Sequence, residues 1–395
     1  MSTKILFAEC MGKHVTAIYQ NERIQELRYF PLHPSTDCQV GDIYIGKVKK
    51  ILPKINAAFI EIGNHTECYY PLEEVEYTTF TKKPGKKPIA AGDELLVQIK
   101  KEASKAKQPT VTGNLNLTGK YVVLTSGNKK TGISSKLDPA SRQRLVDFSS
   151  AMEPCEFGIV FRTNAGDADF EVIQAEIRQL NDLFTRLLTI APTRTCYTRL
   201  YATPNPALLI LRDIYHSSLD EIIVDAGVED GRLYEEAKDY ISAYQPEYLP
   251  LLRAYNDKDY PLSKCYSMEH ITSEALSEKI WMKSGGFLVI QPTEALTVID
   301  VNSGKCLMKN KNSFDINKEA AVEIAHQIRL RNLSGIIIVD FINMKDKETC
   351  SELLSFLQKE LYKDPNPGKV IEMTKLQLVE ITRRKTHKTL AESVR

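Results

Sequence analysis

Two apolar segments, each ending in an aspartate, constrain most strongly how this chain can fold. In the first, every second residue from Leu296 to Asn302 shares one face of an extended strand, and Asp300 lies on that face. The alternation predicts a buried face that ends in a polar pair. The second segment, Ser334–Phe341, is apolar up to Asp340, which is typical of a strand covered on both faces. The sequence therefore predicts two carboxylates at the ends of two strands.

The residues between these strands predict a helix over Asn317–Asn332. Its apolar side chains recur at the i, i+3, i+4 and i+7 positions, arginines occupy its last turn, and Gly335 is placed to close it. A strand, a loop, a helix and a second strand in this order can bring both strand ends to one edge of a sheet. We therefore expect Asp300 and Asp340 to lie together, although they are far apart in the chain.

Two converging carboxylates favour a divalent cation, because like charges repel unless a positive charge offsets them. Magnesium typically takes one or two protein carboxylates, keeps several waters and binds a substrate phosphate, and it can generate hydroxide for a phosphodiester displacement. Two alternatives remain open. Either aspartate can instead cap the loop after its strand, and Ser303–Gly304 can form a simple turn in which Asn302 holds no metal-bound water.

Composition limits the class of protein. The chain has 395 residues, 43% of them hydrophobic, enough for about two to four domains with cores of their own. Its 52 basic and 51 acidic residues give a net charge of +1, so affinity for nucleic acid must come from local patches. The eight cysteines form no CxxC motif, and we expect neither a secretory leader nor a membrane-spanning run. These features predict a cytoplasmic protein without a disulfide framework.

Evenly spaced short strands between residues 40 and 116 predict a small barrel of the OB type. The alternation in Ala57–Ile62 turns Phe59 outward, near Tyr69 and Tyr70 in the pattern, and lysines flank these strands. OB folds hold single-stranded nucleic acid in this way, because bases stack on the rings and cations follow the phosphates. The alternative is that Phe59 packs against a neighbouring element and that the lysines form a solvated surface.

Other segments complete the predicted organisation. Residues 1–39 form short strands that are too few to close a core, so we expect them to pair with the strands and helices after Pro206. The pattern of Ala168–Ile190 predicts an amphipathic helix whose apolar stripe belongs to a core. A further helix is expected to end near Trp281.

Two basic features have a functional and a plain interpretation. The predicted strand Gly158–Thr163 ends in Arg162 and Thr163, which can bind a phosphate or simply lie at the surface. The basic end of the chain, Lys375–Arg395, either favours RNA phosphate or forms a solvated terminus. No Walker loop, GxGxxG, HExxH or GxSxG motif occurs, which argues against the common nucleotide-binding and hydrolase classes.

Several of these motifs occur together in one known family. The segments EALTVIDVNSGK, RNLSGIIIVDFINM, GDIYIGKV, AAFIEIG, GIVFRT and EMTKLQLVEITRRK resemble the catalytic region of the ribonuclease E/G family, from about residue 2 to 390. The resemblance implies a multidomain α/β plus all-β fold. Its expected parts are a split ribonuclease-H-like domain (1–39 and 206–280), an OB-fold RNA-binding barrel (40–116), a 5′-sensor subdomain (117–205) and a deoxyribonuclease-I-like α/β catalytic domain (281–395).

The resemblance also implies a chemistry. Family members are magnesium-dependent endoribonucleases of RNA processing and decay, which cut single-stranded A/U-rich RNA with a metal-activated water and leave a 5′-monophosphate; manganese can replace magnesium. Asp300 and Asp340 match the family's metal-binding aspartates. Asn302 matches the asparagine that orients the reacting phosphate, so these three residues are the expected catalytic group.

The resemblance assigns RNA contacts as well. Phe59, Tyr69 and Lys107 match positions that grip RNA, where the second is usually phenylalanine. Arg162 and Thr163 match the pocket that senses a 5′-monophosphate. The expected partner is therefore single-stranded RNA, with or without that phosphate.

Three departures from the family pattern limit these expectations. The chain has no cysteine after Cys350 and so lacks the CPxC motif that shares zinc between subunits. Zinc and a zinc-linked dimer are therefore not expected, while another homo-oligomer stays open; either the sequence ends before the motif or this branch lacks it. Lys375 replaces an arginine of the sensor region and lacks its bidentate geometry. Gln108–Thr110 departs from a glycine-containing run with an arginine.

Two rival functions remain beside the endoribonuclease. A non-catalytic RNA-binding protein could keep the barrel and lose the nuclease, but the presence of Asp300, Asn302 and Asp340 argues against it. A metal-dependent nuclease acting on DNA is disfavoured by the barrel. RNA and DNA substrates would separate these cases, because only RNA offers the 2′-hydroxyl.

Overall fold

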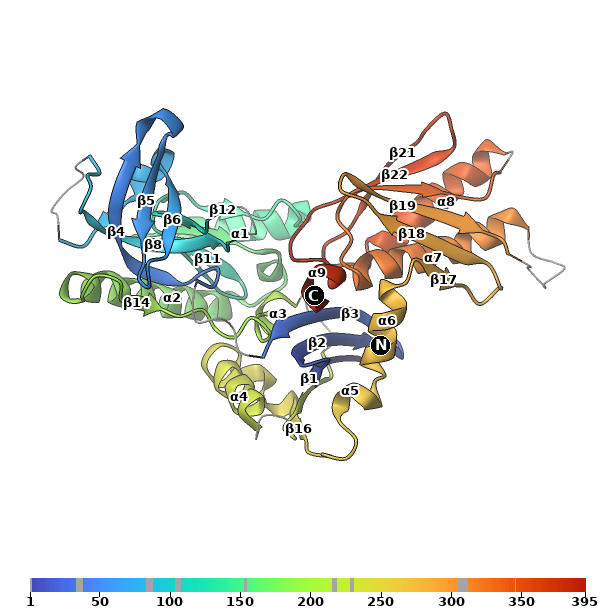
Figure 1. Cartoon of the computed structure of the whole chain (residues 1–395), viewed down its shortest axis with the longest axis horizontal. Helices are drawn as coiled ribbons and strands as arrows, with labels where there is room; N and C mark the ends of the chain where they lie inside the picture. The colour runs from blue at the N-terminus through green and yellow to red at the C-terminus, as the bar shows by residue number, and fades with distance from the viewer. Residues whose placement is uncertain are drawn as a thin grey trace. The chain divides into compact units, whose positions relative to one another are not determined.

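The computed structural model describes most of the chain, in two compact units. It covers residues 2–32, 38–82, 88–103, 108–152, 155–214, 219–227, 231–304, 312–344 and 346–395. The first unit combines Met1–Leu32 with His216–Arg395, and the second is His33–Tyr215. Each unit contains two β-sheets (Figure 1). Within the described ranges, no helix has both the length and the apolar character needed to cross a membrane.

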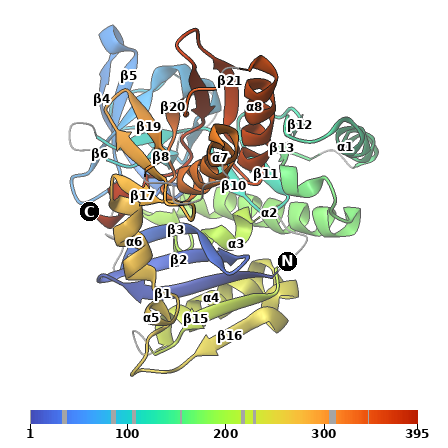
Figure 2. The same ribbon diagram turned by 90° about the vertical axis from the view of Figure 1, so that its right-hand side faces the viewer.

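The first unit begins with a five-stranded sheet in the order β16-β15-β1-β2-β3 (Figure 2). Strands β1 to β3 form an antiparallel meander, and β1 pairs in parallel with β15, with Lys4 opposite Glu221. This pairing confirms that the first strands of the chain complete a layer with residues after Pro206. The strands are β1 (Thr3–Cys10), β2 (Lys13–Gln20), β3 (Arg23–Pro31), β15 (Glu221–Asp225) and β16 (Leu252–Tyr255), and the helices beside them are α4 (Arg232–Tyr244), α5 (Leu262–Cys265) and α6 (Met268–Leu276).

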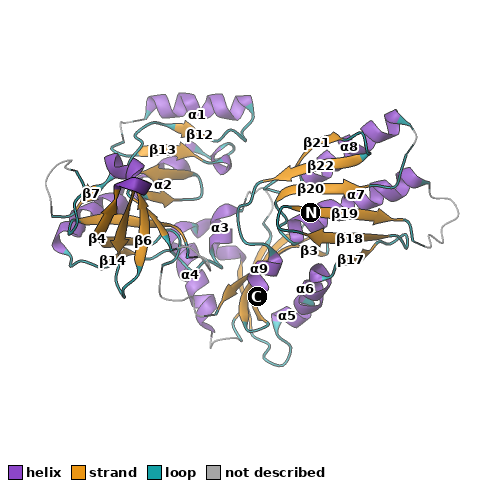
Figure 3. Ribbon diagram, turned by 45° about the horizontal axis from the view of Figure 1, so that its top comes forward, coloured by secondary structure: helices purple, strands orange, loops and turns teal. Residues whose placement is uncertain are grey.

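The second sheet of this unit has six strands in the order β17-β18-β19-β20-β22-β21. Two helices, α7 and α8, lie along it (Figure 3) and share a buried apolar cluster with its strands. The elements are β17 (Lys279–Trp281), β18 (Phe287–Pro292), β19 (Leu296–Asn302), α7 (Ser313–Leu330), β20 (Gly335–Asp340), α8 (Lys347–Leu361), β21 (Lys369–Met373) and β22 (Leu378–Arg383), followed by α9 (Leu390–Val394).

Only one face of the six-stranded sheet is covered. Ile299 and Ile337 are fully buried under the helices, whereas Val298 is 36% and Ile336 is 53% exposed on the opposite face. The expectation that the second strand is covered on both faces is therefore wrong. The expectation that Asp300 ends a buried face is wrong too, because it shares its face with Val298. Both helices pack on one side of the sheet, and the apolar residues Val298 and Ile336 on the other side are exposed.

Two local predictions fail beside this sheet. Residues near Trp281 form strand β17 instead of a helix end. Helix α7 ends at Leu330, and Asn332 takes the left-handed conformation (φ 49°), so that Asn332 and not Gly335 closes the helix. Gly335, with φ 85°, starts strand β20 instead.

The second unit contains the predicted barrel. Strand β4 pairs with both β5 and β8, so β4-β5-β6-β9-β8 close on themselves into an OB-like five-stranded barrel, to which β7 and β14 add at the edges. Closure buries Ile60 and Leu95 completely. The strands are β4 (Ile43–Leu52), β5 (Ala57–Glu61), β6 (Glu67–Pro71), β7 (Thr79–Phe80), β8 (Glu94–Lys101), β9 (Thr110–Thr112) and β14 (Arg199–Tyr201).

A four-stranded sheet in the order β10-β11-β13-β12 follows the barrel and shares an apolar core with it. The predicted amphipathic helix is confirmed as α2 (Phe170–Ile190), which buries the predicted stripe from Ile173 to Leu187. The other elements are β10 (Asn116–Thr118), β11 (Val122–Thr125), β12 (Gly132–Ile133), β13 (Gly158–Phe161), α1 (Pro139–Ala151) and α3 (Leu209–Asp213).

Candidate functional site

The structure brings the two predicted aspartates together. Strands β19 and β20 are parallel, and Asp300 is the direct ladder partner of Asp340. Neighbouring strands lie about 4.8 Å apart, so the two carboxylates stand side by side at the carboxyl ends of their strands. Asp300 is half-buried and Asp340 is exposed, which places both on the open face of the sheet and within reach of solvent and substrate.

Asn302 lies two residues beyond Asp300 on the same face. Its amide Nδ2 donates a hydrogen bond of 2.6 Å to Oδ2 of Asp300, which engages only one of the two carboxylate oxygens. Gly304 follows with a φ of +56°, and a Cβ atom there would come within 2.5 Å of the carbonyl oxygen of Gly285. The left-handed backbone of Gly304 and the hydrogen bond from Asn302 occur together, so the conformation of Gly304 does not draw Asn302 away from Asp300.

Asn317 is a positioning residue that the sequence reasoning missed. It is fully buried in the first turns of α7, accepts a hydrogen bond from the backbone N–H of Ile342 at Oδ1 (3.0 Å) and donates one to the Ile342 carbonyl oxygen from Nδ2 (2.8 Å). These bonds fix the backbone just after Asp340. A polar residue at a position that the helical pattern assigns to the buried side was the available signal, since buried amides are kept only where they are hydrogen-bonded.

The donor set fits a hard cation. Within the described residues, no group of three or more histidine, cysteine, aspartate or glutamate side chains could hold a metal. Asp300 and Asp340 thus offer a pair of carboxylates, which is the number magnesium usually takes from a protein while keeping waters and binding a substrate phosphate. Softer metals prefer thiolate or imidazole ligands, whereas the two side chains that the described strands bring together here are carboxylates.

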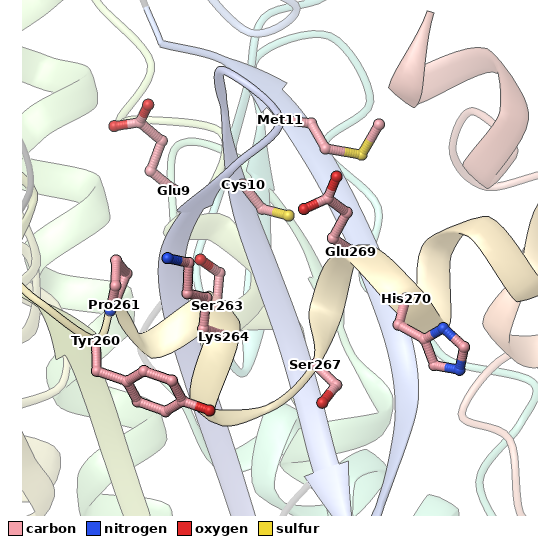
Figure 4. A pocket seen from close by; sticks show the side chains of 10 residues that line it. All are labelled: Glu9, Cys10, Met11, Tyr260, Pro261, Ser263, Lys264, Ser267, Glu269 and His270. Atoms are coloured by element: carbon pink, nitrogen blue, oxygen red, sulfur yellow. The ribbon is translucent and has the colours of Figure 1, made fainter.

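A pocket of about 680 Å³ lies elsewhere in the same unit (Figure 4). Residues of the β1–β2 turn and of the α5–α6 segment line it, among them Glu9, Lys264, Glu269 and His270. It belongs to the five-stranded sheet, whereas the paired aspartates stand on the six-stranded one. This pocket therefore does not contain the paired carboxylates, which lie on an open sheet face.

The barrel presents an aromatic pair on its outer surface. Phe59 of β5 is the direct ladder partner of Tyr69 of β6, and the two rings meet edge to face with centroids 6.3 Å apart. Lys50 of β4 lies opposite Phe59 and places its ammonium 4.7 Å from the centre of that ring. Both rings are half-buried. The pair and its lysine form the surface that base stacking requires.

Lysines of the barrel form ion pairs with acidic side chains. Lys50 reaches Glu67 at 3.3 Å and Lys100 reaches Glu74 at 2.8 Å, so these charges are partly neutralised. Lys107 lies outside the described residues.

Arg162 at the end of β13 already has partners. Its Nη2 atom forms an ion pair of 2.8 Å with Asp213, and its Nη1 atom donates to the carbonyl oxygen of Gly119 at 2.6 Å. Burial alone would raise the pKa of Asp213, but the guanidinium groups of Arg212 and Arg162 outweigh it and hold that pKa below its usual range. The hydroxyl of Thr163 lies 3.0 Å from the hydroxyl of Ser134. A phosphate at Arg162 would have to compete with the Asp213 carboxylate.

Lys375 is exposed in the turn that joins β21 to β22. It belongs to the first unit, whereas Arg162 and Thr163 belong to the second. The structure therefore leaves the grouping of these three residues as a prediction.

A family model described as "Ribonuclease E/G family" matches residues 116–386, a span that contains β13 and both aspartate strands. The chain belongs to the ribonuclease E/G family. The match begins after the barrel strands that carry Phe59 and Tyr69, but individual relatives of the family align across that part too.

Ribonuclease E of Nostoc sp. and ribonuclease E of Synechocystis sp. are each 31% identical to this chain over 99% of its length. The aligned part is 57% and 58% of those two proteins, so the chain spans little more than half of them. Ribonuclease G of Escherichia coli is 31% identical over 89% of this chain and 74% of its own length.

Proposed function

We propose that this member of the ribonuclease E/G family is a magnesium-dependent endoribonuclease acting in RNA processing and decay. The observation that carries the proposal is the pairing of Asp300 with Asp340 on neighbouring parallel strands, on an uncovered sheet face. Asp300 and Asp340 would hold the magnesium, or manganese in its place. When bound, such an ion supplies an activated water and stabilises charge on the reacting phosphate.

The side chains of the site position the cation and orient the scissile phosphate. Asp300 and Asp340 provide the negative charge that draws a cation to the open face, and Asn302 fixes the Asp300 carboxylate by its 2.6 Å hydrogen bond. The amide of Asn302 can also orient an oxygen of the scissile phosphate, because it stands beside the carboxylates on the same face. Asn317 holds the backbone that follows Asp340. Together these residues pre-organise the site before RNA arrives.

We assign RNA binding to the barrel and to the neighbouring sheet. Phe59 and Tyr69 stack bases of single-stranded, A/U-rich RNA, and Lys107 adds positive charge. The 5′-monophosphate binds Arg162 and Thr163, with a weaker contribution from Lys375. We also propose that the five-stranded sheet belongs to a split ribonuclease-H-like domain, residues 1–39 and 206–280. In the sequence, the barrel (40–116) and the sensor subdomain (117–205) are inserted between its two parts. Residues 281–395 form the deoxyribonuclease-I-like domain.

Substituting Asp300 by Asn tests the proposed chemistry. The change keeps the shape of the side chain and removes its charge, so cleavage of a single-stranded oligonucleotide in magnesium should fall at least about 1,000-fold, a loss of about 4 kcal/mol of transition-state stabilisation. RNA affinity, measured by anisotropy, should stay within about threefold of the parent.

Asp346→Asn is the matched control. Asp346 caps helix α8 by accepting a hydrogen bond from the Thr349 N–H at 3.0 Å, and asparagine caps equally well. This variant loses one charge from the same unit and should cut at the parental rate. If Asp300→Asn cut RNA as fast as the control, the assignment would be wrong. An inactive parent that binds RNA would favour the non-catalytic RNA-binding alternative.

The 5′-end assignment is tested with paired substrates. An oligonucleotide with a 5′-monophosphate should be cut faster than the same RNA with a 5′-hydroxyl. Arg162→Ala should bring the two rates together, because it removes the guanidinium that binds the phosphate. Asp213→Asn should widen the difference, because it removes the carboxylate that competes at 2.8 Å. Equal rates for both substrates in the parent would contradict the sensor.

A further inference from the structure

Two aromatic residues stand in line with the candidate site on the open face of the six-stranded sheet. Asn302 of β19 lies opposite Phe287 of β18, and Phe287 lies opposite Trp281 of β17. Both ladders place these three side chains in one row, which crosses the sheet from the site to its edge strand. Each step between strands is about 4.8 Å, so Phe287 and Trp281 lie about 5 and 10 Å from Asn302.

Both rings face away from the core. Their neighbours Ile280 and Leu288 are buried beneath the sheet, so the alternation of the strands turns Trp281 and Phe287 to the open side. Trp281 is 61% exposed, an unusual exposure for the largest apolar side chain. The ring centroids are 5.3 Å apart at an angle of 60°. Phe287 is half-buried beside the exposed Trp281, and apolar surface gathered in one place favours a binding surface.

A lysine gives this surface a charge. The ammonium of Lys279, two residues before Trp281 on the same strand, lies 4.1 Å from the centre of the Trp281 ring and 3.8 Å from that of Phe287. Lys279 is exposed, so its charge reaches solvent. Aromatic rings for bases and a cation for phosphates are the two components of single-strand binding.

We propose that Trp281, Phe287 and Lys279 form a base-stacking ledge for the RNA segment next to the scissile phosphate. This inference rests on the proposed endoribonuclease function and adds a binding subsite to it. A base stacks on Trp281, and the Lys279 ammonium pairs with the adjoining phosphate. Stacking accepts any base, so the ledge holds the strand in register with Asp300 and Asp340 without reading sequence.

RNA suits this surface better than a second copy of the chain. A protein interface would bury the ledge with its lysine at the centre, whereas interface cores are depleted of lysine. The same row leads directly to the carboxylates, so a partner protein seated there would cover the candidate site. A phosphate-bearing strand satisfies the lysine and still reaches Asp300.

The ledge supplies its own probe, because Trp281 is the only tryptophan in the sequence. The full chain carrying Asp300→Asn, which binds RNA without cutting it, is titrated with a single-stranded oligonucleotide in magnesium while tryptophan emission is recorded. Stacking of a base on the indole should quench the emission with the same midpoint as binding measured by anisotropy. An oligonucleotide of the same length with abasic positions should bind without quenching.

Kinetics of variants provide the second readout. Trp281→Ala in the otherwise natural chain should raise KM about 5- to 100-fold, as expected for the loss of one stacked base, and change kcat less than about threefold. Trp281→Phe keeps a stacking ring and should restore most of the affinity. Tyr362→Ala, at an aromatic residue that is 66% exposed beyond α8, is the control and should leave KM unchanged.

The possible results distinguish a failure of the proposed ledge from a failure of the proposed endoribonuclease function. Quenching by base-containing RNA together with a raised KM in Trp281→Ala supports the ledge. RNA that the parent cuts but that leaves the emission unchanged overturns the ledge and leaves the proposed function standing. Quenching by a chain that never cuts RNA supports the ledge while the endoribonuclease fails. Emission that changes with protein concentration alone, with a doubled mass in sedimentation, overturns the ledge in favour of a self-association surface.

Discussion

Asn302 acts on a single oxygen of Asp300, and that contact can be tested by itself. Asn302→Ala removes the hydrogen bond of 2.6 Å and frees the carboxylate to rotate. Loss of a residue that orients a metal ligand typically costs about 10- to 100-fold in metal affinity or activity. We therefore expect the magnesium concentration for half-maximal cleavage to rise by about that factor, measured by magnesium titration of the cleavage rate.

A carboxamide on the same sheet provides the control for that experiment. Gln291 of β18 is exposed and donates a hydrogen bond to Glu278 at 3.1 Å. Gln291→Ala removes an amide of similar chemistry and should leave the magnesium requirement unchanged. A normal magnesium requirement in Asn302→Ala would show that the bond has no role in preparing the site.

At the same scale, the sequence identified the aspartates but not their surroundings. Asp300 and Asp340 each follow an apolar run, and this pattern is visible without the fold. Asn317 was not identified, because its role depends on the carbonyl oxygen and N–H of Ile342, which only the folded chain brings to it. The exposure of Trp281 could not be predicted either, because it depends on which face of the folded sheet the helices cover.

At the scale of elements, periodicity predicted helices and strands well where one face is buried and poorly elsewhere. The helix expected over Ala168–Ile190 is present as α2 (Phe170–Ile190), with the same last residue. The strand β22 was not predicted, because its alternating residues run into a basic sequence that looked like a solvated tail. Arg383 of that strand is in fact buried and forms an ion pair of 2.8 Å with Asp364. A local pattern cannot show a partner that lies in another element.

The contact between β3 and α7 predicts how stability depends on pH. The two terminal guanidinium nitrogens of Arg23 each donate to one carboxylate oxygen of Glu323 at 2.9 Å. Burial alone would raise the pKa of Glu323, but His326 and Arg23 outweigh it and lower that pKa from 4.5 to about 2. The folded state therefore gains stability from this carboxylate above about pH 4.5 and loses it as the pH falls towards 2.

Glu323→Gln tests that dependence. The variant should melt about 2–8 °C below the parent at pH 7, and this gap should narrow as the pH is lowered through 4.5, by differential scanning calorimetry. Glu352→Gln is the control, since Glu352 is exposed and lies 3.6 Å from Lys318. It should melt with the parent at every pH. A gap that stays constant from pH 7 to 3 would contradict the lowered pKa.

At the scale of the molecule, the two units divide the proposed tasks. The unit His33–Tyr215 contains the barrel with Phe59 and Tyr69, and its two sheets share a core of their own. Every residue of the proposed catalytic group belongs to the other unit. The sequence predicted the barrel, because short alternating strands are a local pattern. The sequence also predicted that the first strands pair with a segment after Pro206, because they are too few to close a core. It did not give the partner strand or the register of β1 with β15, because parallel pairing between distant segments has no local signature.

This division predicts that residues 33–215 fold and bind RNA when produced alone. The fragment should unfold cooperatively on heating, bind single-stranded RNA more weakly as salt rises, and cut nothing in magnesium, because it lacks Asp300 and Asp340. Phe59→Ala with Tyr69→Ala should weaken its binding by at least about fivefold, since each stacked base contributes about 1–3 kcal/mol. Ile55→Ala, at an exposed apolar residue of the same barrel, should not. Cleavage by the fragment would show that the reaction does not require Asp300 and Asp340. Equal RNA affinity of the double variant and Ile55→Ala would show that the aromatic pair does not bind RNA.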